Sequence, residues 1–120
     1  MQASAIQEDS LKQLPILIVD DEDSIRRSLT GVLEDEGFSV CIAEDGESAL
    51  ALLRQQPVAL VLLDIWMPGM DGIETLKRIK ESFPNLPVVM ISGHATIATA
   101  ITATRLGAAD FIEKPLDIKG

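Results

Sequence analysis

Residues 58–64 read Val-Ala-Leu-Val-Leu-Leu-Asp, an unbroken apolar run that ends in a carboxylate. Residues 16–21 read Ile-Leu-Ile-Val-Asp-Asp and repeat the same arrangement. Runs that do not alternate between apolar and polar residues are typical of strands buried on both faces, as in a parallel sheet between two layers of helices. These two stretches therefore predict a buried parallel sheet whose strands end in acidic residues.

Helical patterns separate the apolar runs along the chain. Apolar side chains recur at helical spacing in several stretches, and a glycine or a proline closely follows each one. The predicted helices cover residues 23–36, 47–55, 71–82 and 95–105. Further short strands are expected at residues 40–43, 88–91 and 110–113. Because strands and helices alternate and parallel crossovers are right-handed, the pattern predicts a doubly wound α/β fold.

The composition excludes several classes of protein. A chain of 120 residues has room for one compact domain, and its formal net charge is −9. That charge has the wrong sign for a surface that neutralises phosphates, so we expect no direct nucleic-acid contact by this segment. The longest apolar run, residues 58–63, is too short to span a membrane. Cys41 is the only cysteine, which excludes an internal disulfide and suits a cytoplasmic location.

Polar residues follow the predicted strands at the carboxyl edge of the sheet, where doubly wound folds bind their ligands. These residues are Asp20, Asp21, Asp64, Ser92 and Lys114. Three carboxylates held close together repel one another, so a positive group must accompany them. The ammonium of Lys114 or a divalent cation meets that need, and carboxylate and carbonyl oxygens are the ligands that Mg²⁺ prefers. The chain has no cluster of histidine and cysteine, which argues against zinc.

The same set of groups indicates a chemistry. A carboxylate beside Mg²⁺ can act as a nucleophile toward phosphorus and form an acyl phosphate. The metal and a lysine would neutralise the oxygens of the transferring group, and a hydroxyl such as that of Ser92 could donate a hydrogen bond to one of them. The strand-end residues therefore favour phosphoryl transfer to an aspartate.

Four motifs at the strand ends carry a resemblance to a known family. They are Ile18-Val19-Asp20-Asp21-Glu22, Leu63-Asp64-Ile65-Trp66-Met67-Pro68-Gly69-Met70-Asp71-Gly72, Ile91-Ser92-Gly93-His94 and Phe111-Ile112-Glu113-Lys114-Pro115. With these motifs in order, residues 15–115 resemble the receiver domains of bacterial two-component response regulators. The resemblance implies a flavodoxin-like five-stranded parallel sheet in the order 2-1-3-4-5 and a phosphorylation-dependent signalling switch that is not an enzyme in its own right.

The resemblance also implies a role for each site residue. Asp64 matches the phosphoacceptor, which a sensor histidine kinase would phosphorylate. Asp20, Asp21, Asp64 and the main-chain carbonyl of Trp66 match the ligands of Mg²⁺. Lys114 matches the lysine that pairs with the phosphoryl group, and Ser92 and Phe111 match the switch residues. Gly93 would leave room for the phosphoryl group.

Two further segments, residues 92–97 and 107–116, look similar to the receivers of nitrogen-regulation-type activators of sigma-54-dependent transcription. This narrower resemblance implies that an ATPase domain and a DNA-binding domain form the output of the full-length protein. It therefore implies ATP binding and DNA binding outside this segment.

Other functions were weighed against the same residues. A phosphohydrolase with an aspartate nucleophile needs a second carboxylate two residues later, where this chain has Trp66. A flavodoxin-like electron carrier needs a hydroxyl- and glycine-rich phosphate loop, whereas residues 20–22 are all acidic and would repel a phosphate. A receiver-like interaction module that ignores phosphorylation stays open as an alternative.

Three residues near the site have two interpretations each. Asp71 is expected to cap the following helix rather than to bind metal. Trp66 is either a bulky packing residue or a shield that keeps water from the acyl phosphate. His94, the only histidine, is either a solvent-facing loop residue or a base for dephosphorylation.

The ends of the chain lead to expectations about organisation. Residues 1–14 are mostly polar, begin without the basic and apolar segments of a signal peptide, and are expected to form a flexible leader before a receiver domain at 15–120. A receiver has a fifth helix after its last strand, and here that helix would be missing or truncated. The apolar sheet surface left open predicts a homodimer, exchange of terminal elements between chains, or docking of the leader through Leu11 and Leu14.

Overall fold

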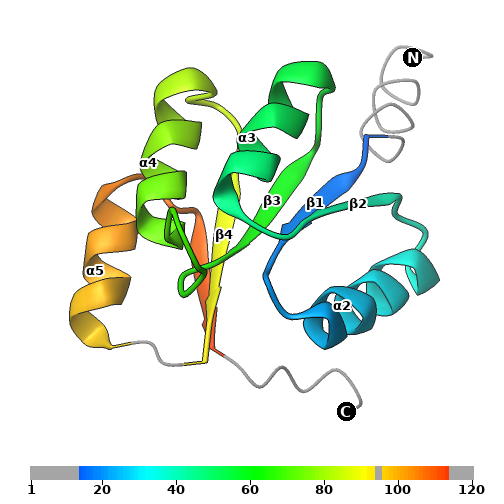
Figure 1. The fold of residues 1–120 in the computed structure, drawn as a ribbon, viewed down its shortest axis with the longest axis horizontal. Helices are drawn as coiled ribbons and strands as arrows, with labels where there is room; N and C mark the ends of the chain where they lie inside the picture. Colours follow the sequence, from blue (N-terminus) through cyan, green and yellow to red (C-terminus); the bar gives the residue numbers. More distant parts are fainter. Residues whose placement is uncertain (1–13, 94–95, 114–120) are drawn as a thin grey trace, which may run out of the picture.

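The computed structural model describes residues 14–93 and 96–113. The described chain forms a five-stranded parallel sheet in the order β2-β1-β3-β4-β5 (Figure 1). The strands are β1 (Ile16–Val19), β2 (Val40–Ala43), β3 (Leu60–Asp64), β4 (Val88–Ser92) and β5 (Asp110–Glu113). The helices between them are α2 (Asp23–Asp35), α3 (Gly46–Gln55), α4 (Gly72–Ser82) and α5 (Ile97–Arg105). The predicted doubly wound α/β fold and its strand order are therefore confirmed.

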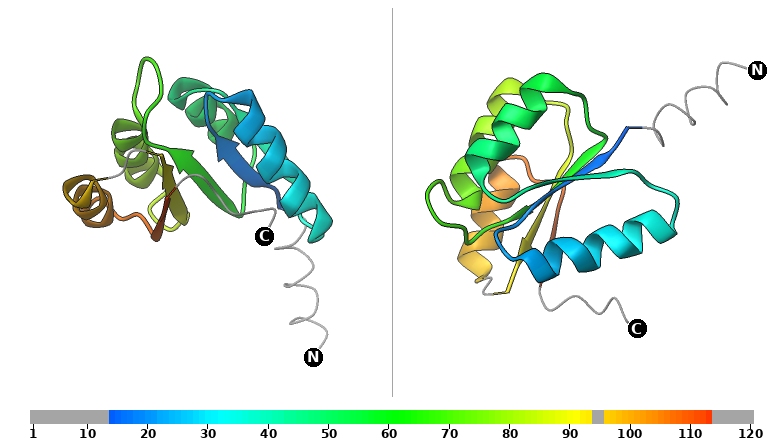
Figure 2. Two further views of the ribbon diagram at one scale, coloured as in Figure 1. Left: turned by 90° about the horizontal axis from the view of Figure 1, so that it is seen from below. Right: turned by 45° about the vertical axis from the view of Figure 1, so that its right-hand side comes forward.

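The helices lie on both faces of the sheet (Figure 2). Helices α3, α4 and α5 cover one face, where residues such as Leu53, Leu76 and Ala103 pack against Leu17 and Leu63 of the central strands. On the other face Leu29 of α2 packs in a second cluster, whose strand residues are Ile16, Ile18, Leu62 and Ile91. Because successive residues of a strand point to opposite faces, both faces of the central strands are apolar. This explains the unbroken apolar runs of β1 and β3.

Side-chain caps decide where three of the helices begin. Asp45, Asp71 and Thr96 each accept a hydrogen bond from the backbone N–H three residues later, so each is the N-cap of α3, α4 or α5. The expected capping role of Asp71 is confirmed. The predicted helices at 71–82 and 95–105 began too early, because the capping residue itself lies outside the helix.

Glycines with positive φ follow two of the helices. Gly37 has φ of 96° just beyond α2, and Gly107 has φ of 103° just beyond α5. The left-handed region is open to glycine at little cost, which makes these positions natural helix stops. The stops predicted from the sequence are thereby confirmed.

Some expectations concern residues outside the described part of the chain. The leader, apart from Leu14, and the start of a fifth helix both lie there, at 1–13 and 114–120. Within residues 14–93 and 96–113, no helix combines the length and the apolar character needed to cross a membrane.

Candidate functional site

The carboxyl edge of the sheet gathers three aspartates. Asp64 is the last residue of β3, and Asp20 follows the last residue of β1. Val19 is the register partner of Leu63, so Asp20 and Asp64 come next on two adjacent parallel strands. One carboxylate oxygen each from Asp20, Asp21 and Asp64 lies within 4.8 Å of the others. The structure therefore brings together the acidic residues that the sequence placed at this edge.

The three carboxylates differ in their exposure to solvent. Asp20 and Asp64 are buried, with 1% and 3% of their surface exposed, whereas Asp21 is exposed. Negative charges at this spacing repel one another, and burial makes the repulsion harder for water to screen. Oxygen donors alone, at a cluster open on one side, fit a hard divalent cation. The acidic pocket could therefore bind a metal ion.

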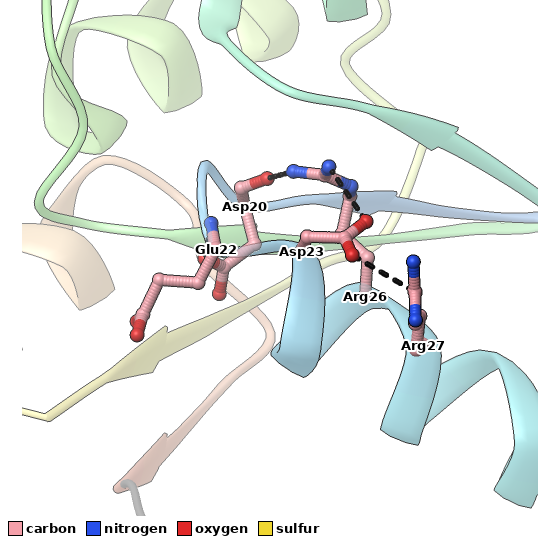
Figure 3. A network of polar contacts seen from close by, with 5 residues as sticks. All are labelled: Asp20, Glu22, Asp23, Arg26 and Arg27. Atoms are coloured by element: carbon pink, nitrogen blue, oxygen red, sulfur yellow. Dashed lines mark hydrogen bonds and ion pairs between the residues drawn. The ribbon is translucent and has the colours of Figure 1, made fainter.

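A network of polar contacts holds the turn that carries Asp20 (Figure 3). The backbone N–H of Glu22 donates to Asp20 Oδ1 at 2.9 Å. Arg26, on the first turn of α2, donates from Nη1 to the main-chain oxygen of Asp20 at 2.6 Å. Its Nη2 donates to Asp23 Oδ1 at 3.3 Å, and Arg27 Nε lies 2.8 Å from Asp23 Oδ2. Sequence reasoning missed Arg26, although its place six residues after Asp20 at the start of a helix was a usable signal.

Ser92 reaches the same edge of the sheet as Asp64. It is the last residue of β4, and its side chain is fully buried. Asp64 is the register partner of Ile91, so Ser92 lies one residue further along the neighbouring strand. The backbone N–H of Ile65 donates to the carbonyl of Ile91 at 3.1 Å, which fixes the two strand ends together. The predicted position of Ser92 beside Asp64 agrees with this register.

Phe111 lies further from the edge than Ser92. It pairs in register with Met90, is half-buried, and packs against the core under α3, α4 and α5. Glu113, the last residue of β5, is the register partner of Ser92. Lys114, which comes next, and His94 lie outside the described residues.

The loop from Ile65 to Asp71 carries Trp66 away from the core. Trp66 has 51% of its surface exposed, so it is not the buried packing residue of one interpretation. The backbone N–H of Gly72 donates to the carbonyl of Ile65 at 2.7 Å and closes the loop. A shallow pocket beside Trp66 is lined also by Ile73 of α4 and Thr102 of α5. The indole thus stands at the rim of the site, next to α5.

Cys41 lies on the edge strand β2 and is half-buried. Burial raises the pKa of its thiol, and the weak hydrogen bond from Gln56 Nε2, at 3.6 Å, opposes that shift. A raised pKa leaves less thiolate at neutral pH, which supports its interpretation as a small packing residue.

This fold and this acidic edge define a class of protein. The chain belongs to the family of response regulator receiver domains, because residues 16–120 match the family described as "Response regulator receiver domain". It is 51% identical over 104 residues to the nitrogen assimilation regulatory protein NtrX of Azorhizobium caulinodans. That match covers 85% of this chain and 23% of the Azorhizobium protein, so the chain spans about a quarter of its relative.

Solved structures give the same result. The receiver domain of NtrX from Brucella abortus is 52% identical, with a TM-score of 0.80, and the match covers 84% of this chain and 86% of that one. The beryllofluoride-activated NtrC4 receiver domain dimer is 37% identical, with a TM-score of 0.82 and coverage of 88% and 87%. The chain is thus the receiver segment of an NtrX-like or NtrC-like response regulator, a regulatory phosphoacceptor domain.

Proposed function

We propose that Asp64 is the phosphoacceptor of this receiver and that Mg²⁺ is held by Asp20, Asp21, Asp64 and the main-chain carbonyl of Trp66. The observation that carries the proposal is the cluster itself, in which a buried Asp64 shares the edge of the sheet with the carboxylates of Asp20 and Asp21. When bound, Mg²⁺ would neutralise charge on the phosphoryl oxygens.

The chemistry at Asp64 balances as a simple transfer. An oxygen of Asp64 attacks the phosphorus of a phosphohistidine on a sensor kinase. The P–N bond breaks, and its electron pair leaves with the imidazole nitrogen. The products are an acyl phosphate on Asp64 and a free histidine on the kinase. The chain performs no further reaction on a separate substrate and is therefore a switch rather than an enzyme.

Ser92, Lys114 and Phe111 convert the new charge into a change of shape. A phosphoryl group adds about −1.5 to −2 charge units and strong hydrogen-bond acceptors. The Ser92 hydroxyl and the Lys114 ammonium bind those oxygens. Movement of Ser92 at the end of β4 opens space for Phe111 on β5 to turn inward. The surface formed by α5 and β5 changes as a result.

The full-length protein would place this switch in a transcription regulator of the cytoplasm. The NtrX relatives support an output made of an ATPase domain and a DNA-binding domain that acts on sigma-54-dependent transcription. The NtrC4 receiver dimer supports assembly of this segment as a homodimer. Residues 1–14 serve as a flexible leader and residues 15–120 as the receiver.

The deciding experiment incubates the protein with Mg²⁺ and acetyl phosphate and follows its mass. We expect one phosphoryl adduct, absent in Asp64→Asn and retained in the matched control Asp71→Asn, because an asparagine can still cap α4. An adduct that survives Asp64→Asn would contradict the assignment of the phosphoacceptor. Absence of any adduct would favour an interaction module that ignores phosphorylation.

Decay of the adduct tests the role of Trp66. Its indole is half exposed at the rim of the site, so we propose that it limits the access of water to the acyl phosphate. Trp66→Ala should therefore shorten the half-life of the adduct, measured by mass after removal of the donor. An unchanged half-life would remove the shielding role and leave the role of Asp64 intact. Trp66 also takes the place where a phosphohydrolase has its second carboxylate, which argues against turnover.

A further inference from the structure

Arg26 is a basic residue beside an acidic site, and its side chain is largely buried. Only 14% of its side-chain surface is exposed, whereas 80% of the surface of neighbouring Arg27 is exposed. Both arginines lie on the first turns of α2, directly after the acidic turn. Their burial differs because Arg26 folds back over the turn and Arg27 points to solvent (Figure 3).

The guanidinium of Arg26 joins two points of the turn. Nη1 donates to the main-chain oxygen of Asp20 at 2.6 Å, and Nη2 donates to Asp23 Oδ1 at 3.3 Å. Asp20 Oδ1 in turn accepts from the backbone N–H of Glu22 at 2.9 Å. Both the backbone and the side chain of Asp20 are therefore held, the first by Arg26 and the second by the turn itself. A planar fork of donors fixes orientation in a way that a single donor does not.

A contribution to stability alone does not account for this burial. Exposed ion pairs such as that of Arg27 with Asp23 contribute little, and a guanidinium taken out of water loses solvation. Within the described part of the chain, the buried Nε of Arg26 has no hydrogen-bond partner. The benefit that offsets this cost lies in the shape of the turn that presents Asp20 and Asp21.

We propose that Arg26 is a positioning residue for the metal site: its guanidinium clamps the main chain of Asp20 to Asp23 and so holds Asp20 and Asp21 in place to bind a divalent cation. The inference rests on the proposed Mg²⁺ site. It assigns no contact between Arg26 and the metal, because Arg26 acts through the ligands.

Charge and position make opposite predictions, which allows a clean test. Removing a positive charge near three carboxylates should strengthen the binding of a cation if charge alone matters. Loss of the clamp should weaken it, and removal of partners that orient metal ligands typically costs about 10- to 100-fold in affinity. The sign of the change therefore distinguishes the two.

The experiment titrates Mg²⁺ into the full chain and follows Trp66 fluorescence, with calorimetry as a second measure. Arg26→Gln removes the charge and the fork, Arg26→Lys keeps the charge and loses the fork, and Arg27→Gln removes an equal charge from an exposed neighbour. We expect the dissociation constant for Mg²⁺ to rise about tenfold or more in both Arg26 variants. In Arg27→Gln it should stay unchanged or fall slightly.

Two controls separate positioning from general damage. Thermal unfolding without metal measures the stability of each variant, and hydrogen exchange of the Glu22 amide measures the order of the turn. Exchange at Glu22 should speed up in Arg26→Lys and not in Arg27→Gln. This readout keeps the inference testable even if Arg26→Gln does not fold.

The outcomes also separate this inference from the proposed function. Wild-type affinity in Arg26→Lys, tighter binding in Arg26→Gln, or unchanged Glu22 exchange would overturn the role of Arg26 and leave the metal site standing. Failure of the wild-type chain to bind Mg²⁺ would overturn the metal site and this inference together.

Discussion

Single side chains set several local features of this receiver, and Asp45 is one that titrates. Its carboxylate accepts a 2.7 Å hydrogen bond from the backbone N–H of Ser48 and caps α3. This backbone hydrogen bond, followed by the contribution of the Ser48 side chain, lowers the pKa of Asp45 below its ordinary value of 3.8. The cap is therefore strongest when Asp45 carries its charge.

The consequence is a stability contribution that acid removes. A carboxyl group whose pKa is lower in the folded state stabilises the fold above its unfolded pKa, and the contribution is lost as the pH falls through the folded pKa. We expect Asp45→Ala to lower the free energy of unfolding by about 1 kcal/mol at pH 7, measured by urea denaturation. Below the ordinary value of 3.8 the difference should shrink.

Asp45→Asn is the matched control, because asparagine caps a helix without titrating. It should keep most of the stability at pH 7 and lose less of it in acid than the wild type. Equal acid sensitivity of the wild type and Asp45→Asn would contradict the role of the Asp45 charge.

The residues that could be predicted from sequence are those whose place follows from strand ends. Asp20, Asp64 and Ser92 each stand at or just past the end of an apolar run, and parallel register brings such positions to one edge. Arg26 could not be predicted in this way, because its contact depends on the path of a side chain back over a turn. Its neighbour Arg27 has the same charge and a nearly identical place in the sequence, yet it points to solvent.

Helices and strands meet most closely where a glycine allows it. Gly72 opens α4, and a Cβ at this position would overlap the main-chain carbonyl of Asp64 and lie 2.6 Å from Cα of Ile65. The glycine thus lets the helix start lie against the end of β3. Caps and close approaches of this kind decide element boundaries, and they explain why the predicted elements had the right order but began one or two residues off.

We expect Gly72→Ala to be destabilising, by about 1 to 3 kcal/mol, because the atoms in the way belong to the backbone and cannot turn aside. Urea denaturation would measure the loss. Because the displaced carbonyl is that of Asp64, the yield of phosphoryl adduct from acetyl phosphate should also fall in the folded fraction. A variant as stable as the wild type would show that α4 can shift away from β3 without cost.

The opposite result is expected for a glycine in the middle of a helix. Gly31 lies within α2 and is exposed, and a Cβ added there would have nothing within 4 Å. Alanine has a higher helix propensity than glycine by about 1 kcal/mol, and it restricts the unfolded chain. Gly31→Ala should therefore raise the free energy of unfolding by about that amount in urea denaturation. A loss of stability would indicate that α2 packs against something at this position.

At the scale of the whole molecule, the two faces of the sheet are covered unequally. Within the described chain, α2 is the one helix on its face, while three helices cover the other. Ile112 of β5 is exposed, and its register partner Ile91 belongs to the α2-side core. The sequence predicted the layers and the strand order from alternation and from family resemblance. It could not predict how far each face is covered, because coverage depends on how a helix crosses several strands.

The acidic edge also ties the stability of the whole fold to metal. A cation that binds only the folded chain raises its free energy of unfolding, by about 2.7 kcal/mol when the free concentration is a hundred times the dissociation constant. Urea denaturation with Mg²⁺ should therefore shift to higher urea relative to EDTA, with an unchanged slope. Because the chain carries a net charge of −9, potassium chloride at matched ionic strength serves as the control for general screening. If the salt gave the same shift as Mg²⁺, or if Asp64→Asn kept the full shift, the stabilisation would come from overall charge and not from the site at the strand ends.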